Sequence, residues 1–67
     1  MVDIGRAMKS EDRKSLEQLS ARLRAEQASL LVAAAKMDGL PSNSTLQRVA
    51  QLELNIAAIE NTLADPA

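Results

Sequence analysis

The stretch from Val49 to Leu63 places five aliphatic residues at alternating spacings of three and four, namely Val49, Leu52, Ile56, Ile59 and Leu63. This spacing puts all five side chains on one face of a helix, and such a face packs against another helix. The sequence contains no aromatic residue, so the opposing face must also consist of Leu, Ile, Val, Met and Ala. The pattern therefore predicts helices that share an aliphatic seam.

A long first helix is predicted over residues 10–38. Ser10, followed by Glu11 and Asp12, is typical of a helix start. A serine hydroxyl can cap free backbone N–H groups there, and acidic side chains favour the positive end of the helix dipole. Between this start and Gly39 the sequence contains neither proline nor glycine, so nothing interrupts the predicted helix.

A loop is predicted over residues 39–44 and a second helix over residues 45–64. Gly39 suits the left-handed backbone that often follows a helix, and Pro41 cannot continue one. Ser44 opens an S-x-x-Q capping box, which places the start of the second helix directly after it. A connection this short makes consecutive helices antiparallel neighbours.

The sequence thus predicts an all-α fold, an antiparallel two-helix hairpin resembling a coiled coil, over residues 10–64. Residues 1–9 are predicted to form a flexible or partly helical arm, and residues 65–67 a short tail. The predicted hairpin seam consists of Leu16, Leu19, Leu23, Leu30, Ala34, Met37, Val49, Leu52, Ile56, Ile59 and Leu63.

Polar residues interrupt and flank this seam. The position that breaks the row of leucines in the first helix falls at Glu26 or Gln27. Gln27 is the better candidate because it has no charge to desolvate, and folding about the loop places it opposite Ile56. Glu53 and Glu60 lie seven residues apart on one side of the second helix, where they either reach cations on a neighbouring helix or form a solvated edge.

Both predicted helices carry a second apolar line nearly opposite the seam. In the first helix this line is mostly alanine, which is either a helix former on an exposed face or a shallow surface for a close-packed helix. Two helices cover little apolar surface, and the chain has no cysteine for a disulfide. We therefore expect a homodimer that forms a four-helix bundle. The expected contacts with a second copy or another partner are Ala28, Leu31, Val32, Leu54 and Ala57. The N-terminal segment, either a docking arm or a loose end, would contribute Val2, Ile4 and Met8.

The residue types that most enzymes need are missing from this sequence. It has no His, Cys or Tyr, and its serines have no base that could activate them. Its carboxylates offer no cluster that so small a fold could shield from water. The sequence predicts a protein that is not an enzyme and that holds no metal, cofactor or small-molecule substrate.

The leading hypothesis is a small protein–protein interaction module, an adaptor or an antagonist of a larger protein, that buries an apolar helix face in a partner's groove. The alternative is a dimeric helical-hairpin regulator that binds RNA or DNA through Arg13, Lys14, Arg22 and Arg24. The net charge of −1, the acids interleaved with these residues and the lack of aromatic stacking residues disfavour nucleic acid.

The sequence also shows no pattern typical of a membrane-spanning helix or a signal peptide. The longest apolar run, Leu30–Ala35, is far shorter than the ~20 residues of a membrane-spanning helix. The first residues show no basic start followed by an apolar run, so no signal peptide is expected. Together with the absence of cysteine, these observations favour a cytoplasmic protein.

Overall fold

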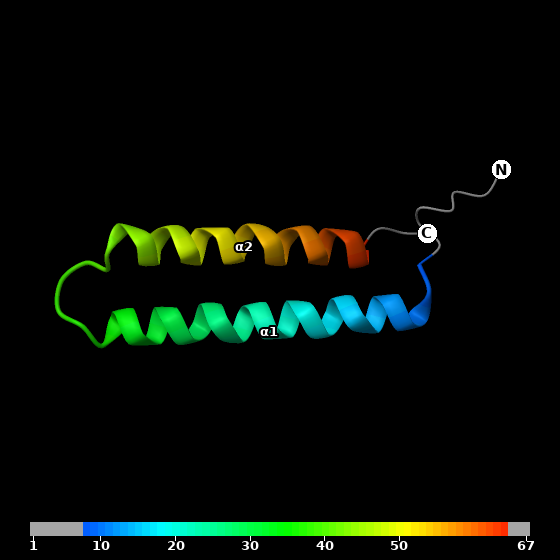
Figure 1. The fold of residues 1–67 in the computed structure, drawn as a ribbon, viewed down its shortest axis with the longest axis horizontal. Helices are drawn as coiled ribbons and strands as arrows, with labels where there is room; N and C mark the ends of the chain where they lie inside the picture. The colour runs from blue at the N-terminus through cyan, green and yellow to red at the C-terminus, as the bar shows by residue number, and fades with distance from the viewer. Residues whose placement is uncertain (1–7, 65–67) are drawn as a thin grey trace.

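The computed structural model describes residues 8–64 and folds them into two helices, α1 (Ser10–Ala35) and α2 (Asn43–Ala64). Figure 1 shows the helices side by side and antiparallel, joined by a loop over residues 36–42. We call this end of the molecule the loop end and the other the open end. At 1.5 Å per residue, the 26 residues of α1 extend about 39 Å and the 22 residues of α2 about 33 Å. The predicted all-α hairpin is confirmed.

The first helix begins at Ser10, but Ser10 is not its cap. The cap position belongs to Lys9, whose side chain makes no capping hydrogen bond. The Lys9 carbonyl accepts the N–H of Arg13 at 2.9 Å. Glu11 and Asp12 lie in the first turn, where their charges favour the positive end of the helix dipole. The prediction of a serine cap is wrong because Ser10 already belongs to the helix, whereas a cap residue has non-helical backbone angles.

The first helix ends at Ala35, three residues before the predicted end at 38. The N–H of Lys36 is shared between the carbonyls four and three residues back, at 3.2 and 3.3 Å. The N–H of Met37 donates to the carbonyl three residues back, at 3.2 Å. The last turn thus tightens before the chain leaves the helix. Gly39 adopts the left-handed backbone, with φ of 80°, but within the loop and not directly after the helix.

The second helix begins at Asn43, two residues earlier than predicted, because Ser42 is its cap. The Ser42 hydroxyl oxygen accepts the N–H of Thr45 at 3.2 Å, and the Ser42 carbonyl accepts the N–H of Leu46 at 3.0 Å. Ser44, the predicted cap, lies inside the helix. Ser42 is the first residue after Pro41 that offers a hydroxyl, and the helix starts directly after it.

The buried core is small and lies along the seam. Among residues 8–64, the buried apolar side chains are Leu52 and Ile56, with 5% and 1% of their surface exposed, and Ser20 is buried with them. The half-buried residues of the seam and its flank are Leu16, Leu19, Leu23, Gln27, Leu30 and Ala34 in α1 and Thr45, Val49, Ala57, Ile59 and Leu63 in α2.

The burial pattern indicates the register of the two helices. Residues 16, 20, 23, 27, 30 and 34 of α1 alternate in spacings of four and three, and so do residues 45, 49, 52, 56, 59 and 63 of α2. Folded about the loop, the two rows match one for one. Gln27 confirms this register, because its amide donates to the Val49 carbonyl at 3.4 Å and to Glu53 Oε1 at 3.0 Å. The predicted position of Gln27 opposite Ile56 is therefore off by about one turn, since the loop lies earlier in the chain than predicted.

Truncating the most buried side chain tests the seam. We expect Ile56→Ala to lower the free energy of unfolding by about 2–5 kcal/mol, because it leaves a cavity between the helices. Leu54→Ala is the control: Leu54 is 71% exposed on the same helix, and its loss is expected to change stability by less than about 0.5 kcal/mol. Urea titration followed by circular dichroism measures both, and equal effects would contradict this assignment of the core.

Two serine variants distinguish the observed cap from the predicted one. Ser42→Ala removes the oxygen that accepts the Thr45 N–H and is expected to cost about 1 kcal/mol. Ser44→Ala leaves that bond in place and is expected to change stability by less than about 0.5 kcal/mol. The same urea titration measures both variants. A larger loss of stability in Ser44→Ala than in Ser42→Ala would indicate that the helix starts after Ser44, as the sequence predicted.

Candidate interaction surfaces

Charge divides the hairpin along its length. Residues 27–52, which include the loop, contain three charged side chains, Lys36, Asp38 and Arg48. Residues 9–26 alone contain Lys9, Glu11, Asp12, Arg13, Lys14, Glu17, Arg22, Arg24 and Glu26. Because α2 runs antiparallel to α1, Glu53 and Glu60 also lie in the part of the hairpin nearer its open end. We call residues 27–52 the loop half and the remaining described residues the open half.

Exposed apolar side chains gather in the loop half. Six large apolar residues are exposed among the described residues, and five of them belong to this half: Leu31, Val32, Met37, Leu40 and Leu46. Leu40 is 94% exposed in the loop, and Met37 beside it is 69% exposed. We call these five residues the loop-end surface. Low charge combined with large exposed apolar residues is typical of the centre of a protein–protein interface.

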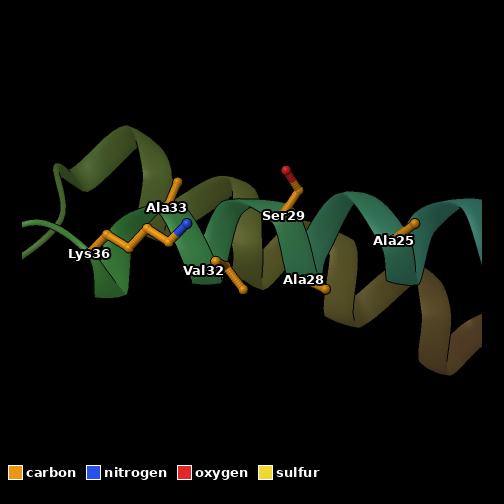
Figure 2. Close-up of a pocket in the computed structure, with 6 residues that line it drawn as sticks. All are labelled: Ala25, Ala28, Ser29, Val32, Ala33 and Lys36. Atoms are coloured by element: carbon orange, nitrogen blue, oxygen red, sulfur yellow. The ribbon is translucent and has the colours of Figure 1, made fainter.

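A shallow groove extends this surface along the outer side of α1. Figure 2 shows the residues that line it on the helix that faces the viewer, with α2 behind: Ala25, Ala28, Ser29, Val32, Ala33 and Lys36. Val32 lies between the half-buried Leu30 and Ala34, two residues from each, so it points away from α2. The Lys36 side chain extends back along the helix toward Val32 (Figure 2), and its aliphatic stem adds to the apolar lining.

A second hollow lies at the loop end itself. Its lining combines the last turn of α1, the loop and the first turn of α2: Leu30, Ala33, Ala34, Met37, Leu40, Pro41, Ser42 and Thr45. Ala33 borders both this hollow and the groove, so the two are neighbours on α1. The loop half therefore carries two neighbouring apolar hollows, one along α1 and one at the loop, and Leu31 and Leu46 line neither of them.

Apart from the bonds of Gln27, the polar contacts between the helices lie in the open half. Arg24 forms an exposed ion pair with Glu60, and the Arg13 guanidinium donates to the Leu63 carbonyl at 3.0 Å. The hydrogen bond and charge of Glu60, with a further contribution from Glu53, raise the pKa of Arg24 above its usual value. Two of the four basic residues proposed for nucleic acid are thus engaged within the hairpin. Lys14 and Arg22 are exposed on α1.

The residues predicted for the seam are all buried or half-buried except Met37. Met37 was expected to continue the apolar face of the first helix to its end. The helix stops two residues earlier, so the methionine belongs to the loop-end surface instead. Glu53 does reach the opposite helix, but its partner is the amide of Gln27 and not a cation.

The residues predicted for contacts between chains lie on different surfaces of the hairpin. Leu31 and Val32 belong to the loop-end surface, and Ala28 lines the groove beside them. Leu54 lies between the buried Leu52 and Ile56, so it points outward from α2, away from α1. Ala57, the fifth residue predicted for contacts between chains, follows Ile56 and is half-buried. Of the predicted docking arm, Met8 is half-buried, whereas Val2 and Ile4 lie outside the described residues.

Four residues of the seam and the loop-end surface are absent from the sets predicted for the seam and the interface. Ser20 and Thr45 are polar residues at the spacing of four and three that the neighbouring apolar residues define, and that spacing was the signal. Leu40 in the loop and Leu46 near the start of α2 are exposed leucines at places where polar residues are usual.

The fold and these surfaces define a class of protein, an antiparallel helical hairpin with a charged open half and an apolar loop half. No known protein family, curated protein or solved structure matches the chain. Within residues 8–64, no group of three or more acidic residues is placed to hold a metal ion, and neither helix is long and apolar enough to cross a membrane.

A substitution at Gln27 tests the role of the polar residue in the seam. Gln27→Leu is expected to raise the free energy of unfolding by about 1 kcal/mol, because a half-buried amide is replaced by an aliphatic group between two helices. Gln18→Leu, on the exposed side of α1, is the matched control and is expected to change little. Stability that falls in Gln27→Leu would mean that the bonds to Val49 and Glu53 outweigh apolar packing.

Proposed function

We propose that this chain is a small, non-enzymatic protein–protein interaction module, an adaptor or antagonist of a larger protein, that acts by burying the loop half against other helices. One observation carries the proposal: five of the six large exposed apolar residues among the described residues lie in the loop half, where charge is sparse. Water contact with this surface is unfavourable by roughly 25 cal/mol for each Å² of apolar area, so its burial drives association.

The partners we propose are a second copy of the chain and a helix of another protein. Two hairpins that share their apolar surfaces form a homodimer with a four-helix bundle where they overlap. Three of the six residues that line the groove on α1 are alanine, which lets a neighbouring helix approach closely. The absence of cysteine is compatible with the reducing cytoplasm, which is the location we propose.

Nucleic acid is not part of the proposal. The engagement of Arg13 and Arg24 within the hairpin leaves Lys14 and Arg22 of the four basic residues, among acidic neighbours. A protein that binds nucleic acid through phosphate contacts needs a denser array of cations.

Comparative capture from a native lysate tests the proposed function. We expect the double variant Leu31→Glu, Leu40→Glu to lose the proteins that the natural chain retains, because it places two charges in the loop-end surface. Leu54→Glu adds a charge to an exposed leucine outside the loop half and is expected to retain them. Nuclease treatment is expected to change nothing. Identical capture by the double variant, or loss on nuclease treatment, would overturn the proposal.

A further inference from the structure

The loop between the helices contains the only Asp-Gly pair of the chain, Asp38 and Gly39, and both residues are exposed. An aspartate can close a five-membered ring with the backbone nitrogen of the next residue, because that nitrogen lies within reach of the side-chain carboxyl carbon. A side chain on the next residue hinders this attack, and glycine has none. The pair therefore marks a position where the backbone can react with its own side chain, provided that the fold leaves the nitrogen free.

The fold leaves the backbone nitrogen of Gly39 free. Within residues 8–64 no group accepts a hydrogen bond from the Gly39 N–H, whereas the N–H groups of Lys36 and Met37 are bonded to carbonyls of α1. Gly39 has a left-handed backbone with φ of 80°, and beyond its two chain neighbours no atom lies within 4 Å of the position that a Cβ would occupy. The peptide unit between Asp38 and Gly39 can therefore rotate without breaking a hydrogen bond of the Gly39 N–H.

Asp12 shows the contrasting case of an aspartate within a helix. The residue after it is Arg13, whose N–H donates to the Lys9 carbonyl at 2.9 Å. Ring closure at Asp12 would require this hydrogen bond to break and the first turn of α1 to unwind. Asp12 and Asp38 are both exposed, so the difference between them is the residue that follows and the hydrogen bond that this residue makes.

We propose that Asp38 is a site of spontaneous backbone modification, at which the folded chain converts aspartate to isoaspartate through a cyclic imide with Gly39. The Gly39 nitrogen attacks Cγ of the protonated Asp38 carboxyl. A C–N bond forms, a C–O bond breaks, and the hydroxyl leaves with the amide hydrogen as water. Water then adds to one of the two imide carbonyls. Cleavage of the bond between nitrogen and the main-chain carbonyl carbon leaves the chain connected through Cγ, which is isoaspartate, whereas cleavage at Cγ restores aspartate.

The modification changes the loop and leaves the helices in place. Isoaspartate adds one carbon atom to the main chain between Met37 and Gly39 and moves the carboxylate onto Cα. Met37 and Leu40, on either side of the reacting pair, both line the hollow at the loop, so the shape of this hollow changes. Both helices and the Ser42 cap lie outside the altered segment. The reaction involves only this chain and water, so the proposal does not rest on the proposed function.

Storage of the folded chain at neutral pH tests the proposal. Trypsin then releases residues 37–48 as one peptide, because Lys36 and Arg48 are the cleavage points on either side of the pair. We expect a second form of this peptide with unchanged mass, in which electron-transfer fragmentation identifies isoaspartate at residue 38. Deamidation of Asn43 in the same peptide changes its mass, so the two reactions are distinguished.

Two controls accompany this measurement. Asp12 is expected to stay unmodified in the folded chain. Asp38→Glu keeps the charge, but its side chain would have to close a six-membered ring, so we expect no modification at residue 38 over the same period. Isoaspartate that forms at Asp12 as readily as at Asp38 would contradict the roles assigned to glycine and to the free N–H.

The denatured chain shows whether the fold protects the loop. We expect Asp38 to react in guanidinium chloride no more than about threefold faster than in the folded chain, because a loop without backbone hydrogen bonds gives little protection. Circular dichroism confirms the helices before storage and is expected to be unchanged after it. A folded chain in which residue 38 stays aspartate, or reacts more than about tenfold more slowly than in denaturant, would overturn the proposal.

Discussion

The structure depends on one narrow seam, to which each helix contributes a single row of side chains. Two helices can bury only the residues that point directly at each other, and here the buried residues are Leu52, Ile56 and Ser20. Every other seam residue keeps part of its surface in water. A third layer of structure, which would shield the flanks of the seam, does not exist within residues 8–64. Apolar surface at the flanks is therefore a direct consequence of the architecture.

The two halves of the hairpin meet this constraint differently. In the open half the flanks of the seam carry polar groups, and the exposed Arg24–Glu60 ion pair links the two helices. Gln27 lies where the halves meet, and its two bonds to α2 fix the register of the seam. Beyond Gln27, large apolar residues occupy some of the flanking positions, with Leu31 on α1 and Leu46 on α2. The distribution of charge along the chain thus decides which part of the surface gains most from being covered by another molecule.

Helical periodicity predicted the hairpin and most of its seam, because the spacing of large apolar residues indicates directly which face of a helix is buried. The seam of α2 from Val49 to Leu63 was predictable for this reason. The ends of the helices were not, because hydrogen bonds of single side chains and a tightened last turn decide them. Ser42 and Ser44 are equally good caps by residue type, and the fold uses Ser42. The position of Met37 then followed from the early end of α1, and with it the extent of the loop-end surface.

The central claim is that this hairpin leaves too much apolar surface uncovered to be most stable alone. The dependence of its melting temperature on chain concentration tests that claim most directly, because association of folded chains stabilises the folded state by mass action. We expect the melting temperature to rise steadily with concentration over two to three orders of magnitude. A high melting temperature that is cooperative and independent of concentration would contradict the claim, since it would mean that two helices and one narrow seam suffice.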